Sequence, residues 1–347
     1  MKWMIYGAYG YTGKLMVKES LKAKMSPVLA GRDSKKVLSL ANEHGLEPRV
    51  FDLKDASKFL EDIEVVVNCA GPFSKTFSPM VEACISTKTH YIDITGEVSV
   101  FEKARNLDKA AKDAKIIICP GGGFDVVPTD CLALKLKHQM PDAVELELGF
   151  DGFKTPSAGT AKTVLENIAS GSLIRKDGEL ITIPSGSDTK EIDFGKGDRL
   201  AMAIPWGDLS TAYTTTSIPN IKVFTSTSRS QLKQLRNLSK VSGLLSTPWV
   251  QRIMQKLIQW KVKGPDADAR EKEKGLIWGM VKNKAGETVV GRVQTNNGYI
   301  IAAVAPILMT QKLLSSSKLN YGHTTPALLM GEDFITQLDG SSDWQLS

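Results

Sequence analysis

The sequence predicts an α/β protein whose N-terminal domain is built on a parallel sheet and is followed by an α+β domain with a mixed or antiparallel sheet. In the first part of the chain, short apolar runs alternate with amphipathic segments about every ten to fifteen residues. Beyond Pro141, strict apolar–polar alternation replaces this rhythm. The chain has 347 residues, which is too many for one compact core, so two domains are expected.

The composition is that of an ordinary globular protein, with 42% apolar and 24% charged residues. A net charge of +6 suits an anionic ligand, but the sequence has no dense basic block with interleaved aromatic residues, so no nucleic-acid partner is expected. The four cysteines lack Cys-x-x-Cys spacing and the four histidines are scattered, so neither a disulfide framework nor a metal site is expected. The chain opens on a predicted strand, and its longest apolar run, 299–309, is too short for a bilayer, so a cytoplasmic location is expected.

The first predicted element is a strand, turn and helix that begin at Trp3. An apolar run, Trp3 to Tyr6, leads into glycines at 7, 10 and 13, and a helical pattern follows. This arrangement brings backbone N–H groups and the positive end of a helix dipole to a pyrophosphate, as in a Rossmann-type domain. The alternative is that the glycines mark an ordinary tight turn. The predicted cofactor-binding residues of the turn are Gly7, Tyr9, Gly10, Tyr11, Thr12 and Gly13.

The second predicted strand, 27–30, ends where a dinucleotide presents its adenosine ribose. An acidic residue at this place would bind the 2′-hydroxyl of NAD, whereas an arginine would accept the 2′-phosphate of NADP. Arg32 holds the position and Ser34 lies close by, so NADP(H) is the predicted cofactor. The alternative is that Arg32 is a solvated turn residue and Asp33 binds the ribose. Ser34 is also expected to be the N-cap of the next helix.

The remaining elements of the first domain continue the same alternation. The predicted strands cover 50–53, 64–69, 90–97 with its exit loop, and 115–119. The predicted helices cover 35–44, 56–60, 78–86 and 101–114. Ala70, Gly71 and Pro72 follow the fourth strand at its carboxyl end, which is the ligand side of an open α/β sheet, so they are predicted cofactor contacts.

The glycine-rich segment 120–125 interrupts this pattern and marks the end of the first domain at residue 123. A helix is expected over 129–140, a strand over 144–148 and a second helix over 158–169. Further strands are predicted at 180–184, 191–194, 201–204, 212–217 and 223–227, with a hairpin of 276–282 and 288–295.

One segment of the second half, 249–263, has two tryptophans at helical spacing and a basic face. Such a segment suits weak contact with a membrane surface or a lid over a hydrophobic substrate. The alternative, which we favour, is a helix packed on the sheet or a contact in a homodimer.

Several motifs together resemble those of one family: GAYGYTG, AGR, NCAGPF, HYIDITGE and GGGFDVVPTD. The sequence is similar to the saccharopine dehydrogenase-like oxidoreductases, and more closely to the branch that includes trans-acting enoyl reductases of lipid and polyketide synthesis. GDLSTAYTTTSIPNI, GPDADAR and GHTTPALLMGEDF extend the similarity over nearly the whole chain.

The resemblance implies an NADP-binding Rossmann domain at 1–123, an inserted substrate or dimerisation domain at 124–317, and a return of about 318–347 to the first domain. It carries cofactor roles onto Gly7, Gly10, Gly13, Arg32 and, more loosely, Gly71. At position 9 the family more often has Thr, where this chain has Tyr9.

Hydride transfer requires mainly that the cofactor be placed against the substrate, with one proton donor for a conjugated double bond or an imine. Tyr91, Asp93 and Asp125 lie at the carboxyl ends of predicted strands and are the candidate catalytic residues. The alternatives are structural: Tyr91 as a core aromatic residue, Asp93 as the holder of the following turn, and Asp125 as a helix cap.

The predicted function is an NADPH-dependent oxidoreductase that reduces a C=C, C=O or C=N bond of a small or lipid- or polyketide-like substrate. One alternative is a non-catalytic protein that binds NADPH or docks to a membrane or a partner. Another is an amino-acid dehydrogenase of the saccharopine type, which would require substrate-binding arginines. The candidates for that role are Arg175, Arg199, Arg229 and Arg292.

Overall fold

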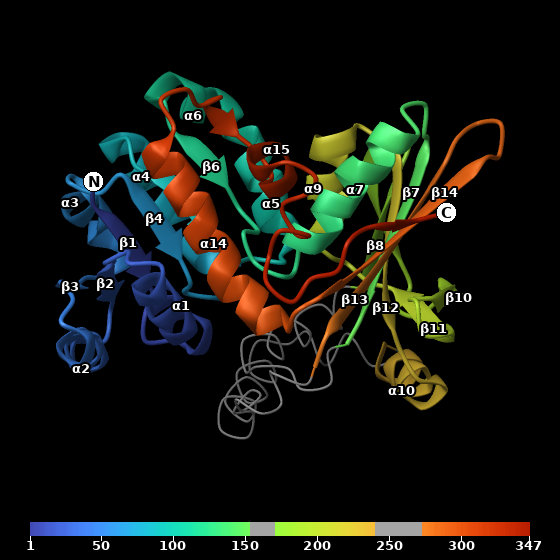
Figure 1. Cartoon of the computed structure of the whole chain (residues 1–347), viewed down its shortest axis with the longest axis horizontal. Coiled ribbons are helices and arrows are strands. Elements are labelled where there is room, and N and C mark those ends of the chain that lie inside the picture. Colours follow the sequence, from blue (N-terminus) through green and yellow to red (C-terminus); the bar gives the residue numbers. More distant parts are fainter. Residues whose placement is uncertain (153–170, 240–272) are drawn as a thin grey trace. The chain divides into compact units, whose positions relative to one another are not determined.

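The computed structural model describes residues 1–152, 171–239 and 273–347, which form two compact units (Figure 1). The first unit combines Met1–Val127 with Gly298–Met330, and the second combines Pro128–Asn297 with Gly331–Ser347. Each unit is therefore assembled from two separate stretches of the chain.

In the described part of the first unit, seven parallel strands form one sheet in the order β15-β6-β5-β4-β1-β2-β3. All residues of the central strands β1 and β4 are buried, which explains why these strands are continuous apolar runs. The strands are β1 (Trp3–Tyr6), β2 (Val28–Gly31), β3 (Pro48–Val50), β4 (Val65–Asn68), β5 (His90–Asp93), β6 (Ile117–Cys119) and β15 (Gly322–His323).

Helices cover both faces of this sheet, because the crossovers are right-handed and the strand order runs in opposite directions on the two sides of the β1–β4 pair. Met4, Tyr6, Val66 and Tyr91 face one way and pack with Phe77 of α4 in a shared apolar core. The helices of the unit are α1 (Tyr11–Lys22), α2 (Ser34–His44), α3 (Ala56–Leu60), α4 (Phe73–Thr87), α5 (Val98–Asn106), α6 (Asp108–Ala114), α14 (Gly298–Ser315) and α15 (Pro326–Met330), with a 3₁₀ turn at Leu53–Asp55.

Helix α14 is the one helix of the described chain whose length and composition would allow it to cross a bilayer. It packs against α1 and against strands β4 and β5, so its apolar side chains contribute to the core of the first unit. The apolar run noted at 299–309 thus belongs to a longer core helix.

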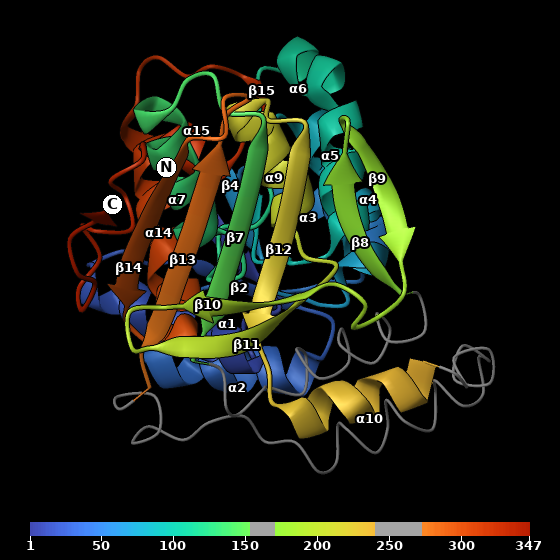
Figure 2. The ribbon, with the colours of Figure 1, turned by 90° about the vertical axis from the view of Figure 1, so that its right-hand side faces the viewer.

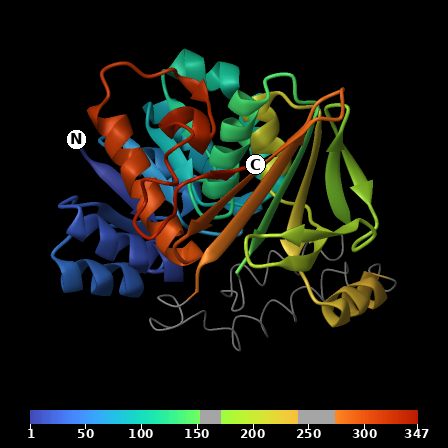
Figure 3. The ribbon, with the colours of Figure 1, turned by 45° about the vertical axis from the view of Figure 1, so that its right-hand side comes forward.

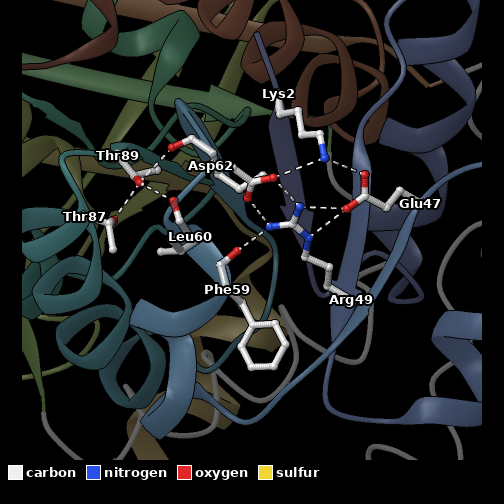
Figure 4. A network of polar contacts seen from close by, with 9 residues as sticks. Lys2, Glu47, Arg49, Phe59, Leu60, Asp62, Thr87 and Thr89 are labelled. Atoms are coloured by element: carbon white, nitrogen blue, oxygen red, sulfur yellow. Dashed lines mark hydrogen bonds and ion pairs between the residues drawn. The ribbon is translucent and has the colours of Figure 1, made fainter.

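Charged side chains gather at the amino ends of the strands, on the edge away from the predicted ligand side (Figure 4). The guanidinium of Arg49 binds both carboxylate oxygens of Asp62, at 2.5 and 2.8 Å, and also Oε1 of Glu47. The same group donates to the carbonyl oxygen of Phe59 at 2.7 Å, and Lys2 contacts both carboxylates. This network fastens β3 to the turn before β4.

In the described part of the second unit, nine strands form a mixed sheet whose main path is β10-β11-β12-β7-β13-β14-β16. Strands β7 and β12 are the parallel pair, and the other pairings are antiparallel (Figure 2). The strands are β7 (Glu145–Asp151), β8 (Ser172–Lys176), β9 (Glu179–Ile183), β10 (Thr189–Asp193), β11 (Asp198–Ala203), β12 (Asn220–Ser226), β13 (Gly275–Lys282), β14 (Thr288–Thr295) and β16 (Gln345–Leu346).

Helix α7 (Val127–Gln139) packs closely on this sheet because two strand positions lack side chains. A Cβ atom on Gly291 would lie 2.7 Å from Leu132, and one on Gly279 would lie 2.9 Å from Leu136. The other described helices of the unit are α9 (Asp208–Thr216) and α10 (Arg229–Ser239).

The predicted fold class, a parallel α/β unit plus a unit with a mixed sheet, is confirmed. The strand predicted at 212–217 is wrong, because Asp208–Thr216 is helix α9. Its Thr and Tyr residues have strand propensity, yet most of its side chains are buried in the helical conformation, and tertiary packing overrides the local preference. The predicted helix at 101–114 is two helices, since Leu107 leaves helical geometry between α5 and α6.

Further differences concern short or unpredicted elements. The third strand lies at Pro48–Val50 rather than 50–53, because Asp52 caps a 3₁₀ turn that begins at Leu53. The elements that were not predicted are strands β8, β15 and β16 and helices α10, α14 and α15. The helix predicted at 158–169 and the segment 249–263 lie outside the described residues.

The predicted domain limits differ from the observed units at three places. The first stretch of the first unit ends at Val127 rather than at 123. The return begins at Gly298, where the apolar helix α14 starts, rather than near 318. The stretch after Met330 belongs to the second unit, where Ser342 N donates to Gln294 O at 2.8 Å and β16 pairs with β14 (Figure 3).

Candidate functional site

The turn between β1 and α1 has a backbone that requires glycine. Gly7 has φ +81°, and a Cβ atom there would lie 2.9 Å from the backbone nitrogen of Ala70. A Cβ atom on Gly13 would lie 2.5 Å from the carbonyl oxygen of Gly7. Gly10 is the N-cap of α1 and donates its N–H to the same oxygen at 2.9 Å. The roles predicted for Gly7 and Gly13, a tight turn and close helix packing, match this geometry.

The N-terminus of α1 is suited to an anion. It has no side-chain cap and no acidic residue in its first turn. Two neighbouring helices differ: Asp33 caps α2, and the carboxylate of Glu97 accepts the first N–H groups of α4, from Phe73 and Ser74, each at 2.8 Å. Since the first N–H groups of a helix have no partner within the helix, the start of α1 fits a phosphate, whereas α2 and α4 already hold a protein carboxylate.

At the carboxyl end of β2, Asp33 rather than Ser34 is the N-cap of α2, and Ser34 is the first helical residue. The Asp33 carboxylate accepts the Lys36 N–H at 3.2 Å and pairs with Lys36 Nζ at 3.1 Å. The backbone hydrogen bond from Lys36 is the main cause that lowers the pKa of Asp33. The prediction for Ser34 is therefore wrong by one residue, because both residue types cap helices well and only the backbone geometry separates them. Arg32 is exposed beside this cap.

The aromatic residues of the glycine turn reach to different sides. The ring of Tyr9 lies against Gly31 at the end of β2, so close that a Cβ atom on Gly31 would be 2.6 Å from Tyr9 Cε1. The ring of Tyr11 meets that of Tyr299 in α14 edge-on, with 5.0 Å between centroids. Thr12, the second residue of α1, is partly exposed.

The loop after β4 lies directly beside the glycine turn, as the contact between Ala70 N and the Gly7 position shows. The side chain of Asn68, the last residue of β4, accepts the Ala70 N–H at 3.0 Å, and Thr76 Oγ1 donates to the Ala70 carbonyl at 2.6 Å. Gly71 is exposed, and Pro72 is the N-cap of α4. The structure thus brings the predicted residues of both loops to one place at the carboxyl edge of the sheet.

Tyr91 and Asp93 form a fully buried pair at the end of β5. The Tyr91 hydroxyl donates to Asp93 Oδ2 at 2.7 Å, and Asp93 Oδ1 accepts the N–H groups of Thr95 and Gly121 at 3.0 and 2.9 Å. Burial raises the pKa of Asp93 to about 6 and that of Tyr91 well above its ordinary value. This geometry matches the structural alternatives, a core aromatic residue and a turn holder, and a proton-transfer role for either stays a prediction.

Asp125 follows β6 and is partly exposed, unlike Tyr91 and Asp93. Its carboxylate lies over the loop after β5, where a Cβ atom on Gly96 would be 2.9 Å from Asp125 Oδ2. Although the residue keeps some exposed surface, the surrounding protein removes water from its carboxyl group, and this desolvation raises the pKa of Asp125 to about 7. A carboxyl group with a pKa near neutrality can hold or release a proton at physiological pH.

Sequence reasoning missed Glu97 and Asn68 as residues that shape the site. Glu97 occupies the start of α4, and Asn68 orders the loop that meets Gly7 and also donates to Tyr91 Oη at 3.3 Å. The available signal was a polar residue at the end of an apolar strand for Asn68, and an acidic residue within the HYIDITGE motif for Glu97.

Three of the four arginines considered for a saccharopine-type substrate have partners inside the second unit. Arg175 is buried and donates to the carbonyl oxygens of Leu209 and Gly178 at 2.5 and 2.6 Å. Arg199 pairs with Asp151 at 2.9 Å, and Arg292 donates to the Asp193 carbonyl at 2.8 Å. Arg229 lies on α10. These contacts hold loops and strands of the second unit.

Across residues 1–152, 171–239 and 273–347, no group of three or more His, Cys, Asp or Glu side chains could hold a metal ion. None of the four cysteines forms a disulfide. Burial raises the pKa of Cys69, next to the β4 loop, far above its ordinary value, so its thiol stays protonated.

Comparison with known proteins gives matches for sequence and for structure. Residues 3–119 match the sequence model of the saccharopine dehydrogenase NADP-binding domain. A trans-acting enoyl reductase of Mycobacterium leprae is 33% identical over 150 residues, which are 40% of this chain and 35% of that protein. A saccharopine dehydrogenase-like oxidoreductase of Bos taurus is 28% identical over 182 residues, 45% of this chain and 41% of that protein. The matches thus span less than half the length of these relatives.

The structure of saccharopine dehydrogenase (L-Glu forming) from Saccharomyces cerevisiae superimposes with a TM-score of 0.65 at 13% identity. The superposition covers 100% of this chain and 99% of that chain. At this identity the match shows a shared fold.

Proposed function

Residues 3–119 belong to the saccharopine dehydrogenase NADP-binding domain family, as the motifs predicted, and from this premise we propose that the protein is an NADPH-dependent oxidoreductase. The proposed reaction is reduction of a C=C, C=O or C=N bond in a small or lipid-like substrate. The observation that carries the proposal is the start of α1, which has no capping side chain and lies above a turn that only glycine can form.

The residues of the first unit suit NADPH in separate ways. The first N–H groups of α1 would hold the pyrophosphate, and Gly7 and Gly13 keep the backbone close enough for this contact. Arg32 would contact the 2′-phosphate with its planar guanidinium. Asp33, the residue that would otherwise favour NAD, is engaged with Lys36 as the N-cap of α2.

When bound, NADPH would supply the hydride, and the chain would supply the proton and the positioning. Asp125 is the proposed proton donor, because its pKa of about 7 leaves a substantial fraction of the carboxyl protonated at neutral pH. Tyr91 and Asp93 are proposed to position it indirectly, since Asp93 fixes Thr95 and Gly121, which belong to the two loops that carry Gly96 and Asp125.

The cofactor assignment is tested by fluorescence titration of the full chain with NADPH and with NADH, on the wild type and on Arg32→Ala. Loss of a charge-assisted phosphate contact should cost about 1.5–3 kcal/mol, which is about ten- to a hundredfold in NADPH affinity. NADH affinity should not change. Arg105→Ala is the matched control, since Arg105 is an exposed arginine near the end of α5, and this helix end lies at the opposite edge of the sheet.

Turnover separates the enzyme from a non-catalytic NADPH-binding protein. Oxidation of NADPH would be followed by absorbance with an enoyl thioester, a ketone and an imine as acceptors. The proposal expects oxidation with at least one acceptor and a large loss in Asp125→Asn with unchanged NADPH affinity. Tight NADPH binding without oxidation by any acceptor class would favour the binding-protein alternative.

A further inference from the structure

Tyr9 links the glycine turn to the end of β2. Its ring edge lies on the backbone of Gly31, where an added Cβ atom would be 2.6 Å from Cε1 and 3.3 Å from Cδ1. The residue at position 31 must therefore be glycine as long as this ring is in place. Gly31 immediately precedes Arg32, so the ring lies beside the place proposed for the adenosine ribose.

The same ring holds a cation. Lys36 Nζ is 5.5 Å from the centroid of the Tyr9 ring, which is within the range of a cation–π interaction. The same ammonium group also pairs with the Asp33 carboxylate at 3.1 Å. A lysine side chain on an exposed helix turn normally samples many rotamers, so an aromatic face and a carboxylate together restrict where the charge lies.

We propose that Tyr9 strengthens the preference of this chain for a 2′-phosphate, by holding the Lys36 ammonium group near Asp33, the residue that follows Arg32 in the chain. The 2′-phosphate then meets two cations, where an exposed Arg32 alone would offer one. This inference rests on the proposed function, because it requires that a dinucleotide binds at the glycine turn. Tyr9 is a positioning residue here, and its ring, not its hydroxyl, carries the effect.

Two substitutions at position 9 distinguish the effect of the aromatic face from the effects of side-chain volume and of the hydroxyl group. Tyr9→Phe keeps the aromatic face, so the ratio of the NADH and NADPH dissociation constants should stay within about twofold of the wild-type ratio. Tyr9→Leu keeps apolar volume but has no aromatic face, so NADPH affinity should fall about two- to fivefold while NADH affinity is unchanged. Gly31→Ala displaces the ring and should lower the same ratio.

A double-mutant cycle with Lys36→Met tests whether the ring acts through the lysine. Lys36→Met removes the charge and nearly keeps the length of the side chain. It should lower NADPH affinity more than Tyr9→Leu does. In the Lys36→Met background, Tyr9→Leu should cause no further loss of NADPH affinity. A full additional loss in that background would overturn the proposed route through Lys36.

Thermal unfolding of each variant identifies any that fail to fold. If one of them does, the NADPH and NADH affinities of Tyr9→Phe can still be compared with those of the wild type. Equal losses of NADPH and NADH affinity in Tyr9→Leu would show a purely structural role and overturn the inference. If Arg32→Ala abolishes the NADPH preference and Tyr9→Leu does not alter it, this inference fails and the proposed function stands. If the wild type binds neither cofactor, the proposed function fails, and this inference fails with it.

Discussion

Asp93 gives the sharpest stability prediction, because it is a fully buried carboxyl group with a defined set of donors. Its pKa is raised by burial from 3.8 to about 6. A difference of about two pKa units, at about 1.4 kcal/mol for each, corresponds to about 3 kcal/mol of unfolding free energy. Since the folded-state pKa is the higher one, this stability is present below about pH 4 and is lost as the pH rises through 6.

Asp93→Asn mimics the protonated carboxyl group at every pH. The amide oxygen can still accept the N–H groups of Thr95 and Gly121, and the amide nitrogen can donate to the Tyr91 hydroxyl. We therefore expect the free energy of unfolding of the variant, relative to wild type, to increase by about 3 kcal/mol between pH 4 and pH 7. The assay is urea unfolding of both proteins at a series of pH values. The quantity compared is the difference between their free energies of unfolding at each pH.

Asp33→Asn is the control of opposite sign. Its hydrogen bonds to Lys36 lower the pKa of Asp33 from the ordinary value of 3.8, so wild type should gain stability over that variant as the pH rises toward 4, and the gain should be nearly complete above that pH. If the difference in the free energy of unfolding between wild type and Asp93→Asn stays constant from pH 4 to pH 7, the buried-carboxyl interpretation is refuted. A change in the same direction as that of Asp33→Asn would refute it too.

Two further predictions concern the loops around the site. Gly13→Ala places a methyl group 2.5 Å from the Gly7 carbonyl oxygen, so the overpacking cost of about 1–3 kcal/mol should exceed the gain in helix propensity of about 1 kcal/mol. NADPH titration of this variant should show at least tenfold weaker binding, and unchanged binding would show that this close contact does not shape the cofactor site. Glu97→Ala removes the acceptor for two N–H groups of α4 and should lower the free energy of unfolding in urea by about 1–2 kcal/mol, whereas an unchanged value would show that water replaces this cap at no cost.

The features that could be predicted from the sequence were local. The glycine turn is encoded within residues 3–17 as an apolar strand, three glycines and a helical pattern, and each central strand of the first sheet is a short apolar run. Parallel strands that are buried on both faces are short apolar runs in any protein. The order of strands and helices in the first unit could therefore be predicted from the sequence.

The features that sequence reasoning missed depend on contacts between distant residues. The cap at the start of α4 comes from Glu97, which is 24 positions after Phe73, and Asp93 binds the N–H of Gly121, which is 28 positions later. Strand β15 has two residues, too few for a periodic pattern, so the return of the chain could only be inferred by resemblance. The β-branched and aromatic residues of α9 favour a strand locally, and the buried helix shows that packing with distant parts of the chain outweighs this preference.

The most direct test of the central claim, that the Gly7–Gly13 turn and the end of β2 bind NADPH, is hydrogen–deuterium exchange of the full chain with and without each cofactor. We expect NADPH to slow exchange in peptides that cover residues 7–13, 31–36 and 69–73. NADH at the same saturation should protect 7–13 and 69–73 but leave 31–36 close to the free protein, because it lacks the 2′-phosphate. Protection by NADPH confined to other parts of the chain, or none at saturating concentration, would contradict the account.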